Sequence, residues 1–157
     1  MPPSESELGK VESEMQDLET ARKRLKGKGL TLSIVKEGKT VFETGSRGMS
    51  GLLGAIERHE DELRGASVAD KVVGKAVALL CVYAEVEAVY AVILSRKAKA
   101  LLEENSIGVE WDTLVANVLD ADKVAACPFE ELAAEIADPE EAYRKLKALQ
   151  NSLEGCR

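Results

Sequence analysis

The feature that most constrains the fold is a continuous apolar run at residues 87–94, EAVYAVIL. A strand that is apolar on both faces is typical of a sheet with helices on both sides. The wider stretch 76–94 is apolar enough to suggest a membrane span, but Glu85 and Glu87 lie near its middle. A carboxylate there would cost about 2.5–3.5 kcal/mol in lipid. We therefore predict a buried helix followed by a buried strand, and no membrane partner.

Helical and strand-forming segments flank this run. LTLSIV and TVFET surround KEGK and predict an antiparallel hairpin. We expect helices at 15–27, 46–64, 67–83 and 96–105, and two more at FEELAAEI and PEEAYRKLKALQNSL. IGVEW is expected to form a further strand. Residues 112–126 have no clear assignment. Asp138 is the expected N-cap of the last helix, with Pro139 after it. Gly65 is the expected cap after the helix at 46–64.

This order of elements predicts an α/β fold, a three-layer α/β/α sandwich with a mixed sheet. The 157 residues fit a single domain at 15–157 after a flexible acidic tail at 1–14. The three cysteines lack CxxC spacing, and the first residues contain no apolar leader segment. Both observations favour a reducing, cytoplasmic location.

Polar and small residues form a narrow strip in ASVADKVVGKAVALLCVY, residues 66–83. If the segment is one helix, Ser67, Asp70, Lys71, Gly74 and Lys75 share one face of it. The plain interpretation is a capping box of Ser67 and Asp70, with both lysines in solvent.

A glycine inside a helix costs about 1 kcal/mol relative to alanine, which favours a close neighbour or a ligand at Gly74. Lysines beside the free N–H groups of a helix start favour a phosphate or carboxylate guest.

A second helix start has charges that oppose the helix dipole. Ser95 is the expected N-cap, yet Arg96 and Lys97 follow it in the first turn. Solvated surface charges are one explanation. The other is an anion held by Ser95 and Arg96, because loops after parallel strands are where open α/β sheets bind ligands.

Cys127 precedes Pro128 at an expected helix start, where the dipole can lower the pKa of a thiol. Glu130 and Glu131 oppose that effect. The alternatives are a buried structural cysteine and a nucleophile or reversible adduct site. A nucleophile here would need assistance from Lys71 or Lys75, since the single histidine, His59, lies in a charged helix end.

The formal net charge of −7 disfavours nucleic acid as a partner. The local exception is RKRLKGK at 22–28, which is typical of a solvated helix end.

SVADKVVGKAVALL, VYAVILS with the helix after it, and CPFEEL together resemble an uncharacterised prokaryotic family, a domain of unknown function with a cytidine-deaminase-like fold. The resemblance covers residues 17–146. It implies that the two helix starts converge on one pocket, which Cys127 could close. Deaminases carry H-x-E and P-C-x-x-C at these starts to hold zinc. Here Gly74–Ala76 and Ser95–Ala98 stand in those places, so we expect no metal, no cofactor and no deamination by the zinc route.

Two functions fit these residues. The first is binding of a small anionic ligand, of which a nucleotide is one example, by Ser67, Lys71, Gly74, Ser95 and Arg96, with Cys127, Lys75 and Asp70 as candidate catalytic groups. The second is a non-catalytic interaction or regulatory domain that acts through a homodimer formed by a sheet edge or the last helix.

Overall fold

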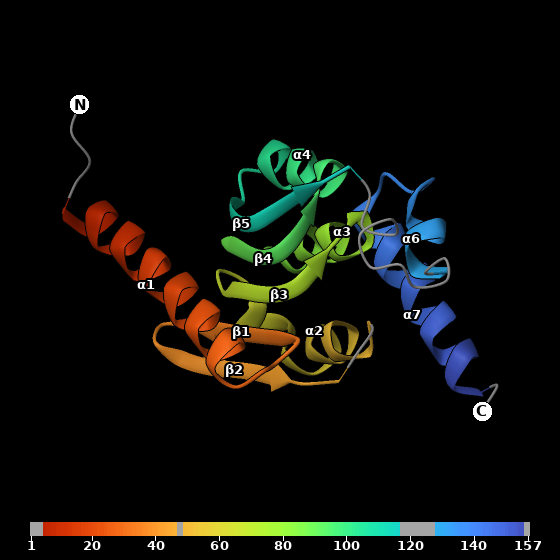
Figure 1. The fold of residues 1–157 in the computed structure, drawn as a ribbon, viewed down its shortest axis with the longest axis horizontal. Coiled ribbons are helices and arrows are strands. Elements are labelled where there is room, and N and C mark those ends of the chain that lie inside the picture. Colours follow the sequence, from red (N-terminus) through yellow and green to blue (C-terminus); the bar gives the residue numbers. More distant parts are fainter. Residues whose placement is uncertain (1–4, 47–48, 117–127, 156–157) are drawn as a thin grey trace.

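The computed structural model describes residues 5–46, 49–116 and 128–155, and the side chains of residues 16–46, 49–116 and 128–152. Its elements are α1 (Glu5–Gly27), β1 (Leu32–Lys36), β2 (Lys39–Thr44), α2 (Ser50–Leu63), β3 (Ser67–Val73), α3 (Lys75–Ala84), β4 (Ala88–Ser95), α4 (Arg96–Glu104), β5 (Gly108–Val115), α6 (Pro128–Ala133) and α7 (Pro139–Gly155). Figure 1 shows a central sheet with helices on either side.

The sheet has five strands in the order β2-β1-β3-β4-β5. β1 pairs antiparallel with β2 and with β3, whereas β3, β4 and β5 run parallel to one another. The predicted hairpin is confirmed: Lys36 opposes Lys39, and Glu37 and Gly38 between them have φ of 51° and 77°. Positive φ at both central residues is the type I′ geometry that suits a two-residue turn.

Helices cover the two faces of the sheet unequally. On one face α1 packs Leu18, Ala21 and Leu25 against Val35 and Tyr90. On the other face the larger core includes residues of α2, α3, α4, α6 and α7. The predicted three-layer α/β/α sandwich with a mixed sheet is therefore confirmed.

The predicted helix at 67–83 is wrong in its first half. Residues 67–73 form β3, the central strand, and the helix begins only at Lys75. The first three residues of β3 are buried, because the sheet is covered on both faces there, so SVADKVV does not alternate as a half-exposed strand would. β-Branched Val68, Val72 and Val73 favour an extended backbone. A strand followed by a helix also provides the crossover that two parallel strands need.

Gly74 is therefore the N-cap of α3, in extended backbone at φ −105° and ψ −169°, and not a glycine inside a helix. The capping box of Ser67 and Asp70 does not exist either, since both residues lie within β3.

Several other element boundaries differ from those predicted from the sequence. α1 begins at Glu5 instead of near Met15, so it includes most of the segment predicted to be a tail. α2 is shorter than predicted and is kinked at His59; its C-cap is Arg64, with Gly65 next in sequence at φ +79°. β5 continues into the segment that had no clear assignment. The expected N-caps are confirmed: Ser95 Oγ accepts from the Ala98 N–H, and Asp138 Oδ2 from the Glu141 N–H.

None of the helices in the described part of the chain is long and apolar enough to cross a membrane.

Candidate functional site

The starts of α3 and α4 lie side by side at the C-terminal ends of two neighbouring parallel strands. Val73 and Leu94 are register partners at the ends of the parallel strands β3 and β4. Gly74 and Lys75 follow the first strand, and Ser95 and Arg96 stand at the corresponding end of the second. The two helix starts are therefore neighbours, as expected, at the ends of parallel strands where open α/β sheets bind ligands. That they enclose one pocket stays a prediction.

The start of α3 already holds a carboxylate from within the chain. Gly74 has no side chain to accept from the first N–H groups, and the first turn of α3 contains no acidic residue. Glu130 of α6 fills this role: its Oε1 accepts from the Ala76 N–H at 2.7 Å. Lys75 reaches the other end of the same segment, where Nζ donates to the Ala134 carbonyl at 2.9 Å. α6 is thus tied to the start of α3 at two points.

A residue next to α4 in sequence accepts a hydrogen bond from the first turn of this helix. Ser95 is only 3% exposed, and its Oγ caps the helix by accepting from the Ala98 N–H at 3.1 Å. The side chains of Arg96 and Lys97 are exposed. Lys99, one turn further, forms an ion pair with Glu103 and lies over the Trp111 ring. Arg96 and Lys97 thus lie in the first turn of α4, and Lys75 lies in the first turn of α3.

Asp70 lies within β3, four residues before Gly74, or at most about 13 Å along the strand. It is partly exposed, and its Oδ1 accepts from the Val72 N–H at a long 3.4 Å. Burial of the carboxyl raises its pKa to about 7, against the opposing effect of backbone N–H groups. Asp70 is therefore an acid that can change charge near neutral pH.

Cys81 of α3 faces the same interior. Burial, and then the nearby Asp70 carboxylate, raise the pKa of its thiol well above the ordinary range. A fully buried thiol in that state is not a nucleophile. Cys81 is a core residue, as expected for a buried cysteine.

The structure does not bring the other predicted residues to the helix starts. Ser67 is buried at the opposite end of β3, where it pairs with Ala88, about 23 Å along the strand from Gly74. Lys71 is exposed and shares the sheet face of Ala69, on the α1 side. Cys127 lies outside the described residues, so its role stays a prediction. The helix starts thus unite Gly74, Lys75, Ser95 and Arg96.

Glu130 is the functional residue that the sequence interpretation missed. It was considered only as a neighbour of Cys127, because a residue 54 positions from its partner gives no local signal. One signal was available: a glycine before a helix whose first turn lacks Asp and Glu leaves N–H groups that need an acceptor from elsewhere.

The donor set at the helix starts does not suit zinc. Zinc sites are built from thiolate, imidazole and carboxylate ligands. Gly74, Lys75, Ala76, Ser95 and Arg96 offer none of these, and the described residues contain no group of three or more His, Cys, Asp or Glu side chains that could hold a metal ion. The Ala76 N–H, at the place expected for deaminase zinc ligands, binds a carboxylate of the chain itself.

Residues 20–149 match the family described as a domain of unknown function, DUF1893. The chain belongs to this family. A solved DUF1893 family protein from Thermotoga maritima is 31% identical, with a TM-score of 0.76 over 85% of this chain and 89% of that one. The predicted membership of an uncharacterised family is thereby confirmed. No curated protein matches the DUF1893 chain.

Parts of two larger solved proteins are similar to most of this chain. One is RibD of Acinetobacter baumannii, 19% identical with a TM-score of 0.43 over 84% of this chain and 38% of that one. The other is a diaminohydroxyphosphoribosylaminopyrimidine deaminase/5-amino-6-(5-phosphoribosylamino)uracil reductase from Thermotoga maritima, 18% identical with a TM-score of 0.42 over 76% and 40%. Similarity this distant carries no argument about activity.

Proposed function

We propose that this DUF1893 protein binds a small anionic ligand at the adjoining starts of α3 and α4. One observation supports the proposal: the Ala76 N–H at the start of α3 donates to the carboxylate of Glu130, and that carboxylate comes from a separate helix. The Glu130 carboxylate therefore occupies the position that we assign to the anionic group of the ligand.

A phosphate or carboxylate group of a ligand competes with Glu130 for this position. Lys75 is partly exposed, and among the described residues its Nζ donates to the Ala134 carbonyl alone, a neutral partner that an anion can replace. Arg96 and Lys97 are exposed on the adjoining helix and add positive charge. Free N–H groups, the helix dipole and neighbouring cations together favour an anion at a helix start. Cys127, next to Pro128 in sequence, stays a candidate nucleophile toward the bound ligand.

Titration calorimetry with inorganic phosphate and nucleoside monophosphates tests the proposal in the full chain. Lys75→Ala should weaken binding at least tenfold, because it removes a cation at the anion. Glu130→Ala should strengthen binding several-fold, because the competing carboxylate is gone. Glu131→Ala is the matched control: the same charge is removed from the neighbouring exposed residue, and affinity should change less than twofold.

The proposal is wrong if neither wild type nor Glu130→Ala binds any of these compounds at millimolar concentration. It is also wrong if Glu131→Ala strengthens binding as much as Glu130→Ala does. In that case net charge, and not the Ala76 N–H, would govern affinity.

A further inference from the structure

The N-terminal half of α1 extends beyond the sheet that its C-terminal half covers (Figure 1). Among described side chains, Leu18, Ala21 and Leu25 are the α1 residues packed in the core. In the sequence, Leu8, Val11 and Met15 continue the 3.5-residue spacing of Leu18 and Leu25 toward the N-terminus. The apolar spacing in the sequence thus continues beyond the residues of α1 that pack against the sheet.

Such an extension needs a partner. Residues 5–15 add about 16 Å of helix beyond Gln16. An isolated helical segment this short is marginal in water, and Gly9 costs about 1 kcal/mol more. Packing of the apolar stripe against another surface would supply the missing stability.

The charges of α1 are divided along its length. Residues 5–15 carry four glutamates and one lysine. Residues 22–28, RKRLKGK, carry five cations and no acid. The helix dipole accounts for such charges only in the first and last turns, whereas the acidic half spans three turns. An antiparallel pair of α1 helices would place each acidic half beside a basic half.

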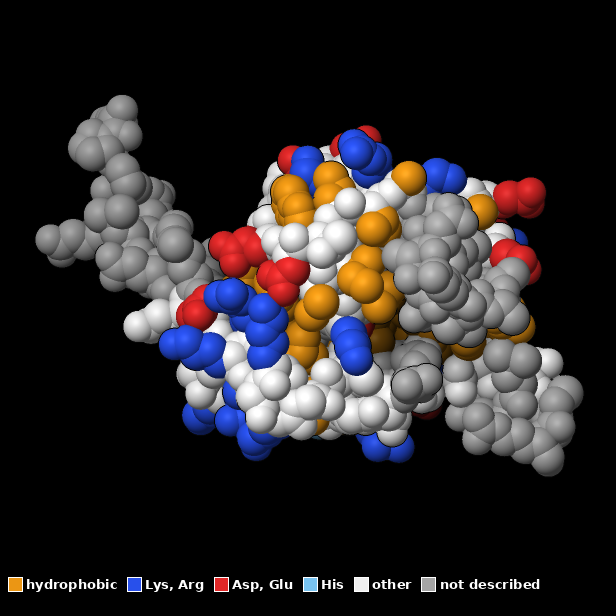
Figure 2. All heavy atoms as spheres, in the orientation of Figure 1, with side chains coloured by type: hydrophobic (Ala, Val, Ile, Leu, Met, Phe, Trp, Pro, Cys, Tyr) orange, Lys and Arg blue, Asp and Glu red, His pale blue; other side chains and the backbone are white. Residues whose placement is uncertain are grey.

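The surface beside the basic half is open. An open groove lies between α1 and strands β4 and β5. It is lined by Arg22, Tyr90, Val109, Glu110, Trp111 and Asp112. Val92 is half-buried on this face, and Lys71 is exposed there. Figure 2 shows hydrophobic side chains at the surface beside a group of Lys and Arg. The face therefore offers both apolar contact and positive charge.

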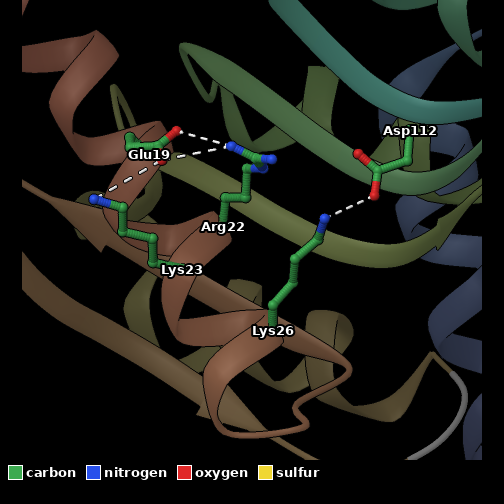
Figure 3. Close-up of polar contacts among 5 residues, drawn as sticks. All are labelled: Glu19, Arg22, Lys23, Lys26 and Asp112. Carbon is green, nitrogen blue, oxygen red and sulfur yellow. Dashed lines mark hydrogen bonds and ion pairs between the residues drawn. The ribbon is translucent and has the colours of Figure 1, made fainter.

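Arg24 is held at two points by Glu43, at 2.6 and 2.8 Å, whereas Arg22 and Lys26 have exposed partners (Figure 3). Arg22 Nη1 lies 3.3 Å from Glu19 Oε2, and Lys26 Nζ lies 2.8 Å from Asp112 Oδ2. These side chains are 37–45% exposed, and exposed ion pairs contribute about 0–1 kcal/mol each. Both cations also lie 5.5 Å from the centre of the Tyr90 ring, whose buried hydroxyl makes no hydrogen bond with the described residues. Exchange of Glu19 or Asp112 for another carboxylate would cost little.

We propose that two copies of this chain form an antiparallel dimer in which the acidic N-terminal half of each α1 lies on the α1 face of the other, beside Arg22 and Lys26. A second copy is the partner that fits, because every copy carries both the acidic helix and the basic face. Antiparallel pairing places the acidic half of each α1 beside the basic half of the other, so both contacts form at once, as a two-fold interface requires. This surface differs from the sheet edge and the last helix considered from the sequence, and it does not depend on the anion site.

Sedimentation equilibrium of the full chain at 50 mM and 500 mM salt tests the dimer. We expect a dimer at low salt and at least tenfold weaker association at high salt, because charge complementarity is screened. Arg22→Glu with Lys26→Glu should raise the dissociation constant at least tenfold. Glu12→Lys with Glu14→Lys should do the same, and the four changes together should restore association to within threefold of wild type.

Arg144→Glu with Lys145→Glu, an equal charge change at exposed positions of α7, is the control and should leave association unchanged. Circular dichroism and thermal unfolding establish that each variant folds. A monomer at 200 µM protein in low salt overturns the proposal. So does a dimer that responds to the α7 change and not to the α1 changes, or a fourfold variant that fails to recover.

Discussion

Replacement of Asp70 by asparagine should stabilise the protein at neutral pH. The folded protein holds the carboxyl at a pKa of about 7, whereas an unfolded chain leaves it near its ordinary value of 3.8. A difference of about three pKa units corresponds to at most about 4 kcal/mol of unfolding free energy. Asp70 is partly exposed, and solvent screening lowers this figure, so we expect about 2 kcal/mol.

The sign of the pH dependence follows from the direction of the shift. Folding favours the protonated carboxyl, so the wild-type protein has its full stability from this group below pH 3.8 and loses it as the pH rises toward 7. Well above pH 7 the carboxyl is ionised in the folded protein, and the full free-energy cost of burying its charge is present. Asparagine is neutral throughout and keeps an oxygen that can accept from the Val72 N–H. The advantage of Asp70→Asn should therefore be about 2 kcal/mol at pH 8 and about 0.5 kcal/mol at pH 4.5.

Urea unfolding at pH 8 and pH 4.5 measures both values, with Asp61→Asn on the exposed side of α2 as the matched control. The control should change stability by less than about 0.5 kcal/mol at either pH. If Asp70→Asn destabilises the protein equally at both pH values, the carboxyl is not a buried acid with a raised pKa, and the reasoning fails.

Two further predictions concern buried polar groups. Cys81, which is fully buried with a raised thiol pKa, should react with a thiol reagent such as DTNB only at the rate of unfolding; rapid reaction of the native Cys127→Ala, Cys156→Ala variant at pH 8 would contradict this. Asp17, 5% exposed, accepts from the N–H groups of Glu37 and Gly38 at 2.8 and 2.9 Å and so ties α1 to the hairpin turn. Asp17→Ala should lower the unfolding free energy by about 2–3 kcal/mol in urea titrations, against less than about 0.5 kcal/mol for Asp61→Ala, because two N–H groups lose their acceptor.

Local signals in the sequence located most elements. The hairpin follows from two β-rich runs around a glycine turn, and α4 and α7 follow from Ser95 and Asp138 as N-caps. The expected convergence of two helix starts also holds, because the C-terminal ends of parallel strands meet at one sheet edge. These features depend on residues near one another in the chain, which is why pattern alone was enough.

The central strand β3 could not be distinguished from a helix in this way. Periodicity identifies a strand only when one face is exposed, and β3 is buried on both faces at its start. This error placed Ser67, Asp70, Lys71, Gly74 and Lys75 on one helical face. In the structure Ser67, Asp70 and Lys71 lie along β3, with Asp70 on the opposite face from the other two, and only Gly74 and Lys75, which follow the strand, stay at the site.

The sequence by itself determined the fold class, because that follows from local propensity and from the order of elements. Its motifs indicated the family by resemblance, and the resemblance implied that two helix starts meet. Only the tertiary structure decided what occupies that place. Glu130 reaches Ala76 across 54 residues, and burial by distant segments gives Asp70 its pKa of about 7. Hydrogen bonds and desolvation between residues far apart in the chain depend on packing, and no short sequence pattern encodes them.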